Sequence, residues 1–193
     1  VPQYRDRVFI IGSSEGKKIT AIPSLCSADN RDELLRHRTV TDALRGFPPL
    51  GKDLPNHTSR DHSQRIIDRY RNLAFGERDS KTRINKLDPA RPSFTIIVGS
   101  DKGGGKGPVH PFEPREVSPR ESARVQTFPD WWGFSGTSRH PIRQVGNAVP
   151  PLMAAAIGRE IMRHFFSGKR RSFQEILSLL SQEHLFDEAV DAI

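Results

Sequence analysis

The stretch that decides the fold is RHPIRQVGNAVPP, residues 139–151. A polar segment ends at Gly146 and Asn147, and the proline pair at 150–151 opens an apolar run. Glycine adopts positive φ angles without a Cβ clash, and proline suits the first turn of a helix, where N–H groups lack partners anyway. The run predicts a sharp loop that feeds a helix, with the Asn147 amide and free backbone N–H groups open to a small polar ligand. An ordinary helix start is the alternative.

Two other motifs accompany this corner: PQYRDRVFIIG at residues 2–12 and RESARVQTFPD at residues 120–130. Together with GNAVPP at 146–151, they resemble three motifs of the DNA (cytosine-5) methyltransferases, in the family's order. The resemblance implies an α/β fold. It would comprise the C-terminal edge of a Rossmann-like methyltransferase lobe and an irregular, mixed α+β target-recognition lobe.

The resemblance also implies boundaries. Residues 1–13 and 138–170 would belong to the catalytic and cofactor lobe, and residues 14–137 would form the target-recognition lobe. Residues 171–193 would then be a C-terminal helical extension.

Composition sets broad limits. The 193 residues suffice for one domain or two small lobes. A hydrophobic content of 35% and a mean hydropathy of −0.58 are low for one compact core, and indicate exposed loops or a missing partner surface. Lys and Arg number 30 against 23 Asp and Glu, so the net charge of +7 favours a polyanionic partner, although solubility alone is an alternative.

Compartment signals point to the cytoplasm. The sequence has no apolar run near the roughly 18 residues that a membrane span needs, and no secretory signal pattern. Its single cysteine, Cys26, excludes an internal disulfide and fits a reducing compartment. We interpret Cys26 as a plain thiol.

Two apolar runs predict strands. Residues 8–11, Val-Phe-Ile-Ile, are continuously apolar, as in a buried parallel strand. Residues 95–98, Thr-Ile-Ile-Val, are β-branched throughout. A buried strand at 8–11 needs neighbours on both sides. We therefore expect the chain to be the C-terminal part of a larger protein, or one subunit of a split one.

Helices are predicted from spacing and caps. The predicted segments are Asp29–Arg38, Thr41–Leu44 and His62–Leu73, followed by a helix that a Ser118–Glu121 capping box opens and that ends near Thr127. A further helix from Pro150 has an apolar stripe at every fourth residue, and amphipathic segments lie at 172–180 and 183–192. The residues 120–126 are expected to be mostly structural.

Gln3, Arg5 and Arg7 alternate, so in an extended segment they would share one face. Two guanidinium forks suit phosphate or carbonyl oxygens, and a solvated basic edge is the alternative. The resemblance implies that Arg7 contacts O2 of the target cytosine. It further implies that Arg5 holds nearby groups and the DNA backbone, while Gln3 orients the flipped nucleotide.

The resemblance implies S-adenosylmethionine as cofactor. Gly146, Asn147, Ala148 and Val149 would contact it, as one wall of its site only. The other catalytic and cofactor motifs of the family are absent from this sequence. Cys26 lies in no Pro-Cys motif and follows the arginine motif, and neither the Phe-x-Gly-x-Gly loop nor the Glu-Asn-Val segment is present. The glycines at 103–107 lack phosphate-loop spacing. We expect the chain alone to be inactive.

A candidate DNA-contact region lies near the end of the variable segment. Thr95 and Ile96 resemble the family's Thr-Ile dipeptide, which packs beside the DNA backbone. Lys102 and Lys106, in the following glycine loop, would add phosphate affinity, and a mere flexible surface loop is the alternative. The histidines at 57, 62 and 110 have no metal-ligand spacing, so no metal is expected.

The expected function is that of the DNA-recognition part of a DNA cytosine-5 methyltransferase, in a bacterial restriction–modification system. Its partners would be double-stranded DNA and a missing N-terminal catalytic part, in the same polypeptide or a separate subunit. Two alternatives stay open: a non-catalytic, sequence-specific DNA-binding module, and a basic module that binds an acidic protein.

Overall fold

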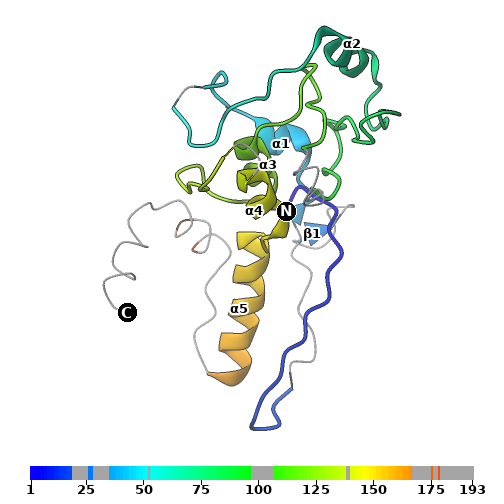
Figure 1. The fold of residues 1–193 in the computed structure, drawn as a ribbon. Helices are drawn as coiled ribbons and strands as arrows, with labels where there is room; N and C mark the ends of the chain where they lie inside the picture. The colour runs from blue at the N-terminus through cyan, green and yellow to red at the C-terminus, as the bar shows by residue number, and fades with distance from the viewer. Residues whose placement is uncertain are drawn as a thin grey trace.

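The computed structural model describes residues 1–18, 26–27, 35–51, 53–96, 107–137 and 140–166, and the single positions 175 and 178. Its elements are β1 Cys26–Ser27, β2 Leu35–Arg36, α1 Val40–Leu44, α2 Gln64–Asn72, α3 Pro119–Val125, α4 His140–Asn147 and α5 Pro151–Phe165. The helices α1, α3 and α4 gather at the centre, with α2 at one end and α5 at the other (Figure 1). The two strands pair in parallel, with Cys26 opposite Leu35.

The main core joins the three central helices. It consists of buried apolar side chains from α1, α3, α4 and the segments beside them: Ala43, Ile96, Ala123, Val125, Phe134, Ile142 and Val145. Phe128 packs against this cluster. Two smaller clusters extend it, one around Leu87 and one around Tyr70. The core thus fixes α4, which carries the start of the GNAVPP motif.

Capping boxes open two of the helices, α1 and α3. Thr39 and Asp42 form a capping box at α1. Ser118 and Glu121 form the predicted one at α3, with Pro119 in the first position. The helix predicted at His62–Leu73 is present as α2, and the one predicted from Pro150 is present as α5. The segments predicted at 172–180 and 183–192 lie outside the described residues, except positions 175 and 178, which are helical.

Residues 8–11 do not form the predicted strand. They have no strand pairing in the described part of the chain, and Val8 and Ile10 are 89% and 94% exposed. A strand needs a neighbour to satisfy its N–H and C=O groups, and none of the described segments supplies one here. Thr95 and Ile96 are likewise irregular, and 97–98 lie outside the described residues.

The predicted loop before Asn147 is also wrong. Residues 140–147 form helix α4, with Gly146 inside its last turn, and the turn to α5 is confined to 148–150. Ile142 and Val145 are both buried, and their helical spacing places them together in the core. Their burial outweighs the small propensity cost of one glycine.

Helix α5 is capped by a residue from another segment. Pro150 makes no side-chain cap. Instead, the Thr127 hydroxyl accepts a hydrogen bond from the Leu152 N–H at 3.2 Å. Thr127, just beyond α3, has a left-handed backbone with φ 68°. The end of one motif therefore positions the helix that the other motif begins.

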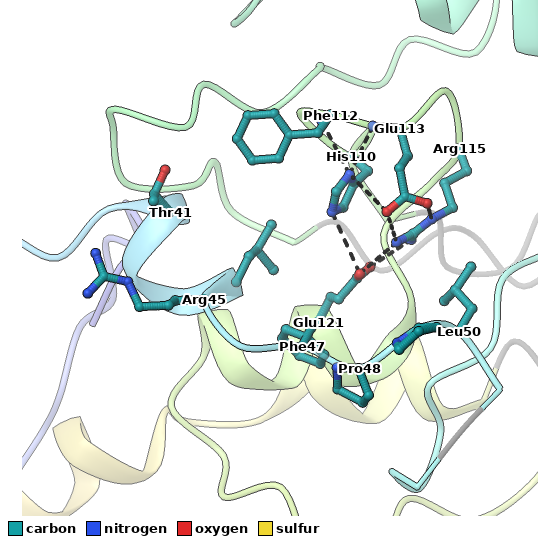
Figure 2. Close-up of a pocket in the computed structure, with 12 residues that line it drawn as sticks. Thr41, Arg45, Phe47, Pro48, Leu50, His110, Phe112, Glu113, Arg115 and Glu121 are labelled. Atoms are coloured by element: carbon teal, nitrogen blue, oxygen red, sulfur yellow. Dashed lines mark hydrogen bonds and ion pairs between the residues drawn. The ribbon is translucent and has the colours of Figure 1, made fainter.

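A cluster of charged side chains, buried except for Glu113, lies beside the core (Figure 2). Arg115 donates to both carboxylate oxygens of Glu121, at 2.7 and 2.8 Å, and to those of Glu113, at 2.9 and 3.1 Å. The Nδ1 atom of His110 accepts from the N–H groups of Phe112 and Glu113. This geometry requires a lone pair on Nδ1, so it favours neutral imidazole.

The cluster shifts three acid–base equilibria. Burial lowers the pKa of His110. The hydrogen bonds and charge of Arg115 lower the pKa of Glu113. Burial raises the pKa of Glu121, but the Arg115 hydrogen bonds and charge outweigh this and lower it overall.

Replacing Thr127 by valine removes the α5 cap and keeps the β-branched shape. We expect the free energy of unfolding to fall by about 1 kcal/mol, as for other lost N-caps. Urea denaturation followed by circular dichroism measures the change. Thr127→Ser keeps the hydroxyl and serves as control. Equal stability of the valine and parent proteins would show that the cap contributes nothing.

Acidification should destabilise the chain in two stages. Below the ordinary His110 pKa of 6.5, the unfolded chain takes up a proton that the folded chain resists. That contribution to stability is complete above 6.5 and is lost as the pH falls towards the lowered folded-state pKa of His110. The contributions of Glu113 and Glu121 are present above their ordinary pKa of 4.5 and are lost as the pH falls through their lowered folded-state values.

Melting temperatures recorded between about pH 8 and pH 4 test this order of events. His110→Gln should remove the first stage and leave the second in place. A melting temperature that rises on acidification from neutral pH would contradict the assignment.

Candidate functional site

Arg5 connects the N-terminal motif to the GNAVPP motif. Its Nη2 atom donates to the carbonyl oxygens of Gly146, at 2.9 Å, and Ala148, at 3.1 Å. Carbonyls at a helix C-terminus lack intrahelical partners, and a cation there is favoured by the helix dipole. The guanidinium therefore holds the end of α4 and the turn into α5, across 141 residues of sequence.

The Arg5 side chain keeps unused donors. Its Nε and Nη1 atoms are buried and have no hydrogen-bond partner among the residues that the structure describes. Burial and the neighbouring charge of Arg7 lower the pKa of Arg5. Two orphaned donors beside the 146–149 turn suit an acceptor group brought by a ligand or by another segment.

Gln3, Arg5 and Arg7 do not share one face, so that expectation is wrong. Gln3 is buried and its Nε2 atom lies 3.4 Å from the Phe94 carbonyl. Arg5 is half-buried, whereas Arg7 is exposed and donates to the Asp6 carbonyl at 2.6 Å. Residues 2–4 pair with Ser93, and this pairing holds Gln3 in a buried position.

The Thr95–Ile96 pair joins this N-terminal segment to the core. The Thr95 hydroxyl donates to the Tyr4 carbonyl at 2.6 Å. Ile96 is 2% exposed and belongs to the main core, so its side chain packs inward. Thr95 is half-buried, so of the two residues it is the one that is accessible to solvent. Lys102 and Lys106 lie outside the described residues.

The four predicted cofactor residues differ in exposure. Gly146 is buried and Ala148 half-buried, whereas Asn147 and Val149 are exposed, Val149 by 47%. The Ala148 N–H continues the helical pattern to the Gln144 carbonyl at 3.0 Å. The side chains open to a ligand at this turn are therefore Asn147 and Val149.

The RESARVQTFPD motif, residues 120–130, contacts the helix that leads into this turn. Gln126 is buried and donates to the Val145 carbonyl at 2.6 Å, joining α3 to α4. Arg120 is buried and donates to the carbonyls of Pro55 and Pro129. This agrees with the predicted structural role. The contact of Arg5 with two specific carbonyls is the feature that sequence alone does not reveal, because no local spacing connects residues 5 and 146.

A cavity of about 560 Å³ lies away from this turn, between α1 and the Arg115 cluster (Figure 2). Apolar side chains such as Leu44, Phe47 and Leu50 form much of its lining. Three of its charged residues, Glu113, Arg115 and Glu121, already bind one another, and Arg45 also lines the cavity. Both carboxylates of the cavity are therefore engaged by Arg115.

Two negative findings concern the described residues only. They contain no group of three or more His, Cys, Asp or Glu side chains that could hold a metal ion. None of their helices has the length and apolar character needed to cross a membrane.

Comparison with known proteins identifies the family. Residues 1–163 match the family model for C-5 cytosine-specific DNA methylases. The chain is 30% identical over 183 residues to the type II methyltransferase M.BbvI of Brevibacillus brevis. This alignment covers 86% of this chain and 46% of that protein. The chain is 33% identical over 125 residues to the type II methyltransferase M.AquIB of Picosynechococcus, covering 56% of this chain and 87% of that protein.

A solved structure agrees. A crystal structure described as that of a DNA modification methyltransferase encoded within an E. coli prophage superposes with a TM-score of 0.60 at 27% identity. It covers 79% of this chain, which spans 53% of that one. The chain likewise spans a quarter to a half of the first three curated relatives that it matches. The chain belongs to the family of C-5 cytosine-specific DNA methylases.

Proposed function

We propose that this chain is the DNA-recognition part of a bacterial restriction–modification methyltransferase that works in the cytoplasm. The enzyme methylates C5 of cytosine within a specific duplex sequence, and residues outside this chain supply its catalytic nucleophile. The observation that carries the proposal is the Arg5 contact with Gly146 and Ala148, which brings two of the three family motifs together at one turn.

The cofactor of the proposed enzyme is S-adenosylmethionine, which supplies the methyl group. Asn147 and Val149 present exposed side chains at the turn, and Arg5 has buried donors without partners among the described residues. These features fit one wall of a cofactor site, with Gly146 and Ala148 providing backbone. Arg5 acts here as a positioning residue that fixes the turn.

The exposed Arg7 is the proposed contact to O2 of the target cytosine. A fixed guanidinium there stabilises the charge that develops on the ring as the base is attacked. Gln3, held against residues 93–94, would orient the segment that carries Arg7. Thr95, with Lys102 and Lys106, would contact the DNA backbone, while Ile96 anchors the segment in the core.

Exposed apolar side chains support the proposal that a separate catalytic part packs against this chain. In the N-terminal segment, Val8 and Ile10 are almost completely exposed. Met162 on α5 and Phe166 just beyond its end are 49% and 67% exposed. Such side chains mark interaction surfaces when they occur together. We propose that residues 1–13 and 138–170 complete the cofactor lobe, that 14–137 form the recognition lobe, and that 171–193 form a helical extension. The match to M.AquIB covers 87% of that protein, so most of that relative aligns with this chain.

Reconstitution tests the proposed function. We expect the chain alone to transfer no methyl group from labelled S-adenosylmethionine to duplex DNA. Adding the catalytic part, with its cofactor loop and Pro-Cys motif, should start the transfer. Turnover by the chain alone would overturn the proposed division of labour. Duplex binding without restored transfer would instead favour a non-catalytic DNA-binding module, and the absence of duplex binding would favour a module for acidic proteins.

Two arginine variants separate positioning from chemistry in the reconstituted enzyme. Arg5→Gln loses charge-assisted hydrogen bonds to the turn, so the KM for S-adenosylmethionine should rise by about tenfold. Arg7→Gln should lower kcat and leave that KM unchanged. Lys17→Gln, also in the N-terminal segment, is the charge-matched control. Equal effects of both variants on kcat and KM would contradict the assignment.

A further inference from the structure

A short hairpin after α2 presents basic side chains that the proposed site does not use. We call residues 78–85 the basic hairpin. Arg78 pairs with Asn85 in an antiparallel bridge. The turn is closed by hydrogen bonds from the Asp79 N–H to the Ile84 carbonyl, at 2.9 Å, and from the Arg83 N–H to the Asp79 carbonyl, at 2.8 Å. Arg78, Lys81 and Arg83 are exposed.

The acidic residue of the basic hairpin points inward. Asp79 is 3% exposed, and its carboxylate accepts from the Thr82 N–H and hydroxyl, both at 2.6 Å. Arg69 of α2 donates to the same carboxylate twice, at 3.1 Å. The negative charge of the turn is therefore neutralised internally, and the outer surface of the turn is left basic.

Arg83 occupies a backbone conformation that does not suit it. Its φ is 60°, in the left-handed region where glycine and asparagine are the relaxed choices. The Arg78 side chain holds this geometry by donating from Nε to the Arg83 carbonyl at 2.9 Å. An arginine at such a position indicates that its side chain is required, because glycine or asparagine would fold there with less strain.

The basic hairpin is rigidly attached to the fold. Ile84 packs with Tyr70 and Val109 in one of the smaller core clusters. Lys86, which follows the hairpin, is buried and donates to the carbonyls of Leu73 and Tyr70 at the end of α2. Within the described ranges, no ion pair is recorded for Lys81 or Arg83. Lys81 and Arg83 are thus two cations without an ion pair among the described residues. The hairpin that carries them is packed against the core at the α2 end of the molecule, opposite α5 (Figure 1).

We propose that the basic hairpin binds backbone phosphates of duplex DNA flanking the target base, with Lys81 and Arg83 as the contacting residues. This inference rests on the proposed function and deepens it, since it locates a second DNA contact outside the methylation pocket. A compact ammonium and a guanidinium fork both bind phosphate oxygens. Preorganised cations lose little side-chain and backbone freedom on binding, so they are well suited to a contact that positions the duplex.

The test measures how salt affects duplex binding by the complete 193-residue chain. Fluorescence anisotropy with a labelled duplex between about 50 and 200 mM NaCl gives both affinity and salt slope. Lys81→Gln and Arg83→Gln should each weaken binding by about five- to tenfold near 100 mM salt and reduce the slope by about one. Lys17→Gln, which removes the same charge elsewhere, should change neither quantity.

Arg83→Gly separates the side chain from the fold. Because glycine relaxes the left-handed backbone, its unfolding midpoint should equal or exceed that of the parent, while duplex affinity falls as in Arg83→Gln. Unchanged affinity in the Lys81 and Arg83 variants, with a parent chain that binds DNA, overturns this inference and leaves the proposed function intact. A parent chain that binds an acidic polypeptide but no duplex overturns both.

Discussion

The fold depends on a buried guanidinium at a place where regular secondary structure is scarce. Arg120 is 0% exposed and donates to the carbonyls of Pro55, Pro129 and Trp132, and the ring of Phe134 lies 5.5 Å from its central carbon. Irregular chain segments leave carbonyl groups without partners, and buried carbonyls need them. Arg120 supplies three donors from one rigid fork, so loops distant in sequence converge on α3 without a sheet to join them.

The three family motifs act as one structural unit around the α4–α5 turn. Gln126 holds the Val145 carbonyl, Thr127 caps α5 through the Leu152 N–H, and Arg5 holds the carbonyls of Gly146 and Ala148. Each contact satisfies a backbone group that a helix end leaves open. The proposed cofactor wall is therefore held in place by residues that lie outside the turn. This explains why the RESARVQTFPD motif, whose residues are largely structural, occurs together with the GNAVPP motif.

Sequence predicted the parts of this fold whose causes are local. The capping box of Ser118 and Glu121 and the start of α5 after Pro150 follow from residues a few positions apart, and both are confirmed. The strand at 8–11 is wrong because a strand depends on a neighbour that the described segments lack. The loop predicted at Gly146 is wrong because the burial of Ile142 and Val145, a tertiary effect, keeps α4 helical through this glycine.

In the candidate site too, the sequence predicts what local motifs determine and misses what tertiary packing determines. The resemblance named Arg5, Asn147 and Val149 from their motifs, and the structure brings Arg5 to the turn that carries the other two. The structure also places Ile96 in the core and Gln3 against residues 93–94, which their motifs alone do not predict. The inward pairing of Asp79 with Arg69 has no sequence signature, because ion pairs between segments are set by packing.

The cap that Thr127 places on α5 has a consequence for protein engineering. An exchange of recognition segments between relatives that is cut at residue 137 takes Gln126 and Thr127 away with the donated segment, while their partners Val145 and Leu152 stay behind. A cut before Ser118 keeps α3, α4 and α5 from one parent. That cut keeps the Gln126 and Thr127 contacts within one parent but divides Arg120 from the Pro55 carbonyl, so relatives exchanged there must share the same backbone around Pro55.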